Sequence, residues 1–255
     1  MSRRKQAATD PGARISVLGA RYGLPGVAVT KLEALVRLLG EDPLAPTAIR
    51  DPATAIDDHL ADSLVALEFE PVLRARRAVD LGSGAGFPGL PLAIALPGTE
   101  FVLVESVTRK SAFIERAADV CELANVEVVN ARVESWGEGV GRVDLATARA
   151  LASLDVVAEY AAPLLALGGT LVAWRGRRDP EVEAAGARAA AQLGMDGPSV
   201  AMVQPYPQAQ HRHLYLMSKV TDTPARFPRR PGIASKRPLG SAPSPSGDSS
   251  DRTRR

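Results

Sequence analysis

The chain of 255 residues has few of the residue types that build metal centres, disulfide frameworks or membrane spans. A single cysteine, Cys121, and three histidines exclude a disulfide framework and a multi-thiolate zinc site, and they leave little for another metal centre. No uncharged apolar run approaches the roughly 20 residues that a membrane helix needs. The basic first residues are not followed by the apolar stretch of a secretory signal. We therefore expect a cytoplasmic protein with neither a metal nor a membrane among its partners.

An excess of charge of one sign is also lacking, but the charges are unevenly distributed. Lys and Arg number 31 against 29 Asp and Glu, a formal net charge of +2. Residues 1–14 carry +3 and residues 221–255 carry +5, which leaves −6 for residues 15–220. Basic ends on a mildly acidic body are typical of proteins that bind a polyanion, and they are equally consistent with solvated chain ends.

Composition divides the chain into four parts. Residues 221–255 contain one aromatic residue, Phe227, and six of the 20 prolines. Such a segment buries too little apolar surface to offset the entropy of ordering, so it is predicted to be flexible, as is the basic segment 1–14. Apolar residues at helical spacing predict a helical section over 15–75, with Thr30 and Glu33 as a capping box in a helix over 27–39, and a second helix over 60–72.

Residues 76–220 alternate between short apolar runs and helical stretches. The helical stretches cover residues 109–123 and 154–167. The apolar runs predict seven strands, at 78–81, 101–104, 126–129, 143–147, 170–174, 199–204 and 213–220. Alternation of this kind predicts an α/β fold with a mostly parallel seven-stranded sheet and helices on both faces. The last two strands are close in sequence and are expected to be antiparallel.

Three glycines at alternate positions, Gly82, Gly84 and Gly86, follow the first predicted strand and its acidic residue Asp80. Glycines let a ligand approach the backbone closely, and in a parallel sheet this turn lies at the carboxyl end of the strand, where ligands bind. The dinucleotide fingerprint would place its third glycine at position 87, which is Phe87. The pattern is therefore typical of S-adenosylmethionine (AdoMet) methyltransferases, with an NAD-dependent dehydrogenase as the weaker alternative.

Glu105 ends the second predicted strand, 23 residues after Gly82. That distance fits the acidic residue that accepts hydrogen bonds from both ribose hydroxyls of a nucleoside cofactor. A surface glutamate without this role is the alternative.

The fourth predicted strand ends at Ala148-Arg149 and lacks the Asn/Asp-Pro-Pro-aromatic motif of exocyclic-amine methylation. Cys121 falls within a predicted helix, which favours a buried core residue over a nucleophile for pyrimidine C5. The remaining candidate is a methyl acceptor that already has a free lone pair, such as guanine N7. For such an acceptor, positioning against the sulfonium methyl group supplies most of the catalysis. Arg149 is expected to bind the AdoMet carboxylate or a substrate phosphate, or else to form a structural ion pair.

Several ordered segments resemble one known family. The run Val79–Ala95 (VDLGSGAGFPGLPLAIA) is similar to the signature of the RsmG (GidB) family of bacterial 16S rRNA guanine-N7 methyltransferases. Further segments that match are 59–63, 106–113, 149–150, 173–176, 212–214 and 227–239. Arg175 stands where many members have lysine. The resemblance spans roughly residues 44–239 and implies a Rossmann-like class I AdoMet methyltransferase.

The resemblance also implies site residues and partners. It implies an AdoMet site that includes Gly82, Phe87, Val133, Glu134 and Arg149, and N7 methylation of a guanine in the 530 loop of 16S rRNA. The expected partner is 16S rRNA or the small ribosomal subunit, and the chain is expected to be a monomer. The basic candidates for RNA contact are Arg175, Arg177, Arg229, Arg230, Lys236 and Arg237. His59 and Asp62 are expected to form an ordinary helix contact and are assigned no role.

Two other functions stay open at the level of sequence. One is a methyltransferase for a small molecule, and the other is a ribosome-assembly factor that binds RNA without catalysis. The first predicts activity with little salt dependence, whereas phosphate contacts make RNA affinity fall steeply with salt.

Overall fold

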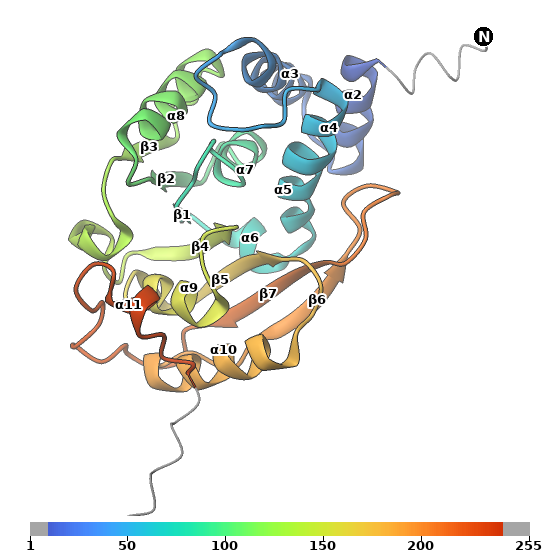
Figure 1. Cartoon of the computed structure of the whole chain (residues 1–255). Helices are drawn as coiled ribbons and strands as arrows, with labels where there is room; N and C mark the ends of the chain where they lie inside the picture. The colour runs from blue at the N-terminus through green and yellow to red at the C-terminus, as the bar shows by residue number, and fades with distance from the viewer. Residues whose placement is uncertain (1–9, 242–255) are drawn as a thin grey trace, which may run out of the picture.

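The sheet has seven strands in the order β3-β2-β1-β4-β5-β7-β6, with helices on both faces (Figure 1). The computed structural model describes residues 10–241 of the chain. The strands are β1 (Arg77–Leu81), β2 (Glu100–Val104), β3 (Val126–Val129), β4 (Val143–Arg149), β5 (Leu165–Arg175), β6 (Ser199–Val203) and β7 (Arg212–Ser218). The first five strands are parallel, while β7 runs antiparallel to both β5 and β6. The predicted fold class, number of strands and antiparallel closing pair are confirmed.

Helices precede the sheet and connect its strands. The segments before β1 are α2 (Pro11–Arg21), α3 (Gly26–Glu41), α4 (Pro52–Ala55), η1 (Ile56–Ala61), α5 (Asp62–Leu64), η2 (Val65–Glu68) and α6 (Glu70–Arg74). Those after β1 are α7 (Gly89–Ala95), α8 (Thr108–Val120), η3 (Val133–Ser135), η4 (Gly137–Gly139), α9 (Leu154–Ala161), α10 (Pro180–Leu193) and α11 (Ile233–Lys236). None of the helices within residues 10–241 is long and apolar enough to cross a bilayer.

Two apolar cores lie on opposite faces of the sheet because successive strand residues point to opposite sides. In β2, Phe101 and Leu103 face the core built with α2, α3, α7 and α8, while Val102 and Val104 face the core built with α9 and α10. The helical section before β1 thus covers one face of the sheet, and the chain after β4 covers the other (Figure 1).

The helical section differs from the prediction in two details. Helix α3 begins at Gly26, so Thr30 lies inside the helix, donates to the Gly26 carbonyl and forms no capping box. The helix expected over 60–72 is instead broken into short segments, with Phe69 in an extended conformation. Pro71 lies in the first turn of α6, the position where proline suits a helix, whereas in a continuous helix it would remove a hydrogen bond.

The region after β4 also departs from expectation. Helix α9 ends at Ala161 rather than near residue 167, because Pro163 follows and β5 already begins at Leu165. Helix α10 is not among the predicted elements, although Asp179 before Pro180 is a typical helix start, and its side chain caps the amides of Glu181 and Val182.

The prediction of a flexible C-terminal segment is wrong for residues 221–241, which we call the C-terminal strap. Phe227 and Ala234 are buried in the core beneath α9 and α10, with exposed fractions of 8% and 1%. The Arg229 guanidinium pairs with both oxygens of Glu159 in α9. One buried aromatic residue, one ion pair and several hydrogen bonds thus hold a proline-rich segment, because the rest of the fold presents a surface for it.

The flexible N-terminal segment predicted over 1–14 is also contradicted in part. Residues 11–14 form the start of α2, which the Asp10 side chain caps by accepting from the Ala13 amide. Residues 1–9 and 242–255, which belong to the two predicted flexible ends, lie outside the described residues.

Substitution of Phe227 tests the packing of the strap. Phe227→Ala is expected to lower the free energy of unfolding by about 3 kcal/mol, because it removes a buried aromatic side chain. Arg230→Ala, an exposed position three residues further on, is the control and is expected to change it by less than about 0.5 kcal/mol. Denaturant unfolding measures both, and equal values for the two variants would contradict the packed strap.

Candidate functional site

The glycine loop connects β1 to α7 at the carboxyl end of the sheet. Its first two amides, those of Gly82 and Ser83, donate to the Val104 carbonyl at the end of β2, over 2.8 and 3.2 Å. Gly84 has φ +62, a conformation that favours glycine, and a Cβ built there would meet nothing closer than the Gly82 carbonyl at 3.9 Å. The backbone at Gly84 is therefore not covered by other atoms of the protein, so a ligand can approach it closely.

Asp80 holds the start of the glycine loop in place. Its carboxylate accepts from the Gly89 amide at the start of α7 (3.2 Å) and from the Thr147 hydroxyl on β4 (2.8 Å). The side chain is fully buried, and burial raises the pKa of Asp80 to about 6. Asp80 joins β1, α7 and β4, and its contacts are those of a structural residue.

Glu105, directly after β2, holds the middle of the glycine loop in place. Its Oε2 accepts from the Gly84 amide (3.0 Å) and its Oε1 from the Val107 amide (2.8 Å). Only 5% of the residue is exposed. Each carboxylate oxygen can accept a second hydrogen bond, so Glu105 keeps acceptor capacity for two ligand hydroxyls.

A cavity of about 450 Å³ lies above the loop, beside the ends of β1, β2 and β4. Five of the residues expected at a cofactor line it: Gly82, Gly84, Phe87, Glu105 and Arg149. Val133 and Glu134, also expected there, are not among its lining residues. Glu134 instead accepts from the Gly232 amide of the strap, and Val133 is buried in the core.

Arg149 ends β4 and is held by the helical section. Its Nη1 donates to the Asp58 carbonyl (2.7 Å) and to Asp62 Oδ2 (2.9 Å), while its Nη2 lies 3.1 Å from His59 Nδ1. Its guanidinium also lies over the Phe87 ring, 5.6 Å from the centroid. The structural ion pair considered for Arg149 is therefore present, and the side chain still lines the cavity.

His59, to which no role was assigned, is part of this site. Its ring stacks on that of Phe87 with the centroids 4.4 Å apart, and its Nε2 lies 3.1 Å from the Thr47 hydroxyl. Burial and the neighbouring Arg149 charge lower the pKa of His59 to about 4. Because the ring stays neutral at physiological pH, its Nδ1 can accept from Arg149. The match of residues 59–63 to the family signature was the one sequence signal for this role.

The basic candidates for RNA contact fall into two groups. Arg229 pairs with Glu159, and Arg175 is half-buried and donates to the Ala152 carbonyl (2.7 Å). The other four are exposed: Arg177, Arg230, Lys236 and Arg237.

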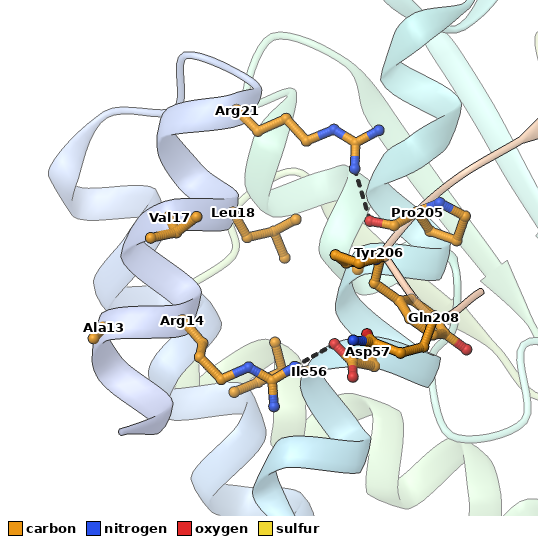
Figure 2. A pocket seen from close by; sticks show the side chains of 12 residues that line it. Ala13, Arg14, Val17, Leu18, Arg21, Ile56, Asp57, Pro205, Tyr206 and Gln208 are labelled. Atoms are coloured by element: carbon orange, nitrogen blue, oxygen red, sulfur yellow. Dashed lines mark hydrogen bonds and ion pairs between the residues drawn. The ribbon is translucent and has the colours of Figure 1, made fainter. Parts of the chain in front are cut away.

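A larger cavity, of about 730 Å³, lies elsewhere (Figure 2). It is open between α2, η1 and the loop after β6, where Arg14 pairs with Asp57 and Arg21 donates to the Pro205 carbonyl over 2.7 Å. Apolar Val17 and Leu18 of α2 line one side of it (Figure 2). None of its lining residues belongs to the glycine loop.

Fold and site together define a class of protein. The chain runs from β1 to β2 and β3 on one side and crosses to β4 on the other, and ligands of open α/β sheets bind at such a reversal of strand order. The glycine loop, Glu105 and the cavity lie at this point. The molecule is a Rossmann-like class I AdoMet-dependent methyltransferase.

Comparison with known proteins identifies the family. The family model described as "rRNA small subunit methyltransferase G" matches residues 29–214. The chain is 42% identical over 196 residues to the ribosomal RNA small subunit methyltransferase G of Rubrobacter xylanophilus. The matched residues make up 74% of this chain and 75% of that protein. It is 41% identical to the protein of the same name from Chloroflexus aggregans, over 76% of this chain and 82% of that protein. The chain belongs to this family.

A solved structure supports the fold. A SAM-dependent O-methyltransferase from Thermotoga maritima superposes with a TM-score of 0.50 at 16% identity, covering 63% of this chain and 64% of that one. At this identity the likeness concerns the fold alone.

Gly84→Val tests the assignment of the cavity to AdoMet. The branched side chain would enter the open space over the loop, and its strained φ would cost about 1–2 kcal/mol of stability. We expect the variant to fold and to lose detectable AdoMet binding in calorimetry. Gly98→Val, at an exposed loop position where a Cβ meets nothing within 4 Å, is the control and should bind normally. Unchanged affinity in Gly84→Val would refute the assignment.

The neutral His59 ring predicts a pH dependence of stability. Between about pH 6.5 and 4 the unfolded chain takes up a proton on His59 that the folded chain does not, so the free energy of unfolding falls as the pH falls through this window. The raised pKa of Asp80 has the opposite effect, since it makes the folded chain more stable as the pH falls. Comparison of the unmodified chain with His59→Gln removes this contribution, because both proteins contain Asp80. The stability difference between the two should shrink as the pH is lowered in denaturant titrations; a constant difference would contradict the neutral ring.

Proposed function

We propose that the chain transfers a methyl group from AdoMet to N7 of a guanine in the 530 loop of 16S rRNA. One observation carries the proposal: a chain of the rRNA small subunit methyltransferase G family has its glycine loop, Glu105 and Arg149 around one cavity. The names of the relatives from Rubrobacter and Chloroflexus support the substrate class.

The residues around the cavity fit the cofactor. Glu105 keeps acceptor capacity for the ribose hydroxyls, and the open backbone at Gly84 allows close approach. Arg149 and the stacked ring of Phe87 offer a positive charge and an aromatic face. Val133 and Glu134 remain candidates for the adenine end. When bound, AdoMet supplies a methyl group activated by its sulfonium charge.

No residue has to remove a proton in this reaction. Guanine N7 already has a free lone pair, so the protein needs to hold the base in line with the methyl group and to exclude water. This suits a site in which the histidine is neutral and already bonded to Arg149 and Thr47, rather than poised as a general base.

The exposed cations support contact with RNA. Arg177 follows β5, and Arg230, Lys236 and Arg237 lie on the strap, which the Glu134–Gly232 hydrogen bond attaches to the loop after β3. Arg175 and Arg229 are less suited, because each is already engaged within the protein. We further propose that the chain acts as a cytoplasmic monomer without a metal ion.

Transfer of a labelled methyl group tests the function directly. We expect AdoMet-dependent incorporation into 16S rRNA that lacks the modification, mapped to a guanine of the 530 loop, and none into RNA already methylated there. Parallel assays on naked RNA and on small subunits identify which is the substrate. Binding of AdoMet without incorporation into either would favour a small-molecule acceptor, and no binding of AdoMet would favour a non-catalytic assembly factor.

A double variant tests the strap as an RNA contact. Arg230→Ala with Arg237→Ala is expected to weaken RNA binding and to lower the slope of log affinity against log salt by about 1 to 2, because two phosphate contacts are lost. AdoMet affinity should not change. The matched control, Arg74→Ala with Arg76→Ala, removes two exposed cations just before β1, at the opposite end of that strand from the glycine loop. Equal effects of the two pairs would count against a role for the strap.

A further inference from the structure

A second, smaller cavity adjoins the cofactor cavity. It has a volume of about 290 Å³ and lies where β4, β5 and β7 meet α5. Arg149 and Ala150 line both cavities. The volume is at the lower end of the range of small-molecule sites, which suits a single flat ring system.

Three buried polar atoms at this cavity are left without hydrogen-bond partners. They are Asp62 Oδ1, Arg175 Nε and Arg212 Nε, and none has a partner within residues 10–241. Asp62 Oδ1 and Arg212 Nε lie 3.4 Å apart as an ion pair whose geometry does not make a hydrogen bond. Unsatisfied buried groups are costly and rare in folded proteins, so a concentration of them at one cavity indicates a ligand that completes them.

The surroundings hold Asp62 in place. Its Oδ2 accepts from Arg149, and its backbone carbonyl accepts from the indole Nε1 of Trp174 over 2.6 Å. With Oδ2 engaged, Oδ1 is the acceptor left at the cavity. Only 6% of Asp62 is exposed, so its side chain is shielded from bulk solvent.

We propose that this cavity takes the base to be methylated and that Asp62 and Arg212 read its identity. Guanine carries an N–H and a carbonyl side by side, at N1 and C6. The free carboxylate oxygen would accept from N1–H, and the guanidinium Nε–H would donate to O6. The inference rests on the proposed function and adds to it the two residues that select the base.

The chemistry of the cavity favours a base over a phosphate. A backbone phosphodiester of RNA carries hydrogen-bond acceptors only, and it would leave the Asp62 oxygen both unsatisfied and repelled. A purine offers donor and acceptor together, and the apolar surface of Trp174, Ala150 and Val203 suits its faces. The carboxylate also lies beside a base that becomes cationic when N7 is alkylated, which stabilises the developing charge.

A ligand series on the unmodified full-length chain tests the proposal. S-adenosylhomocysteine fills the cofactor cavity, and the indole N–H resonance of Trp174 reports occupancy, with Trp136, the other tryptophan, as an internal reference. Guanosine and inosine, which share N1–H and O6, should shift the Trp174 signal. Affinity for 1-methylguanosine and adenosine should be lower by about tenfold or more, since each lacks a hydrogen bond to a charged group. Inorganic phosphate should have no effect.

Other results of the series overturn the inference. These are equal binding of adenosine and guanosine, a shift with phosphate but not with guanosine, or no shift with any nucleoside at millimolar concentration. Methyl transfer to 16S rRNA combined with any of them would leave the proposed function intact and remove only the role of Asp62 and Arg212.

A pair of variants separates base selection from structural support. In Asp62→Asn the amide oxygen stays with Arg149, so an N–H replaces the free acceptor at the cavity. The ratio of guanosine to adenosine affinity should fall by about tenfold or more. Asp58→Asn is the control: Asp58 Oδ1 contacts Tyr206 and Arg212 but does not line the cavity, so the ratio should stay constant. A ratio unchanged in Asp62→Asn, or lowered equally in both variants, would overturn the assignment.

Discussion

The ion pair between Arg149 and Asp62 organises the functional end of this molecule. It joins the last residue of β4 to the helical section that precedes the sheet, across 87 positions of the chain. The same guanidinium is bonded to the Asp58 carbonyl and to the neutral ring of His59, which in turn stacks on Phe87 of the glycine loop. Because Arg149 lines both cavities, this one set of contacts places the proposed cofactor site and the proposed base site next to each other.

Two buried carboxylates give the glycine loop a fixed shape. Glycines permit the conformation of the loop but do not select it, because glycine is also the residue with the most freedom to lose. Asp80 and Glu105 restrict that freedom, because Asp80 accepts a hydrogen bond from the Gly89 amide and Glu105 accepts one from the Gly84 amide. Contacts within the protein therefore set the shape of the loop, which suits a reaction that depends on positioning.

The C-terminal strap shows how composition can mislead. Its prolines, serines and charges are typical of disorder, since they offer little apolar surface. The strap nevertheless packs, with Phe227 in the same core as residues of α9 and α10 and Arg229 on a buried glutamate. The contacts that order it come from residues 30 or more positions earlier in the chain, which a local pattern does not contain.

The sequence by itself determined the strands, their order of appearance and the ligand-binding turn, because alternating apolar runs and a Gly-x-Gly-x-Gly turn after an acidic strand end are local patterns with local causes. The end of the fourth predicted strand pointed to Arg149, and the family signature added Phe87. Only the tertiary structure decided that His59 lines the cavity beside the glycine loop, that Asp62 pairs with Arg149, that Glu134 meets the strap, and that a second cavity adjoins the first. The physical reason is that a buried side chain acts through partners that are distant in sequence, and burial and partnership arise only when the chain has folded.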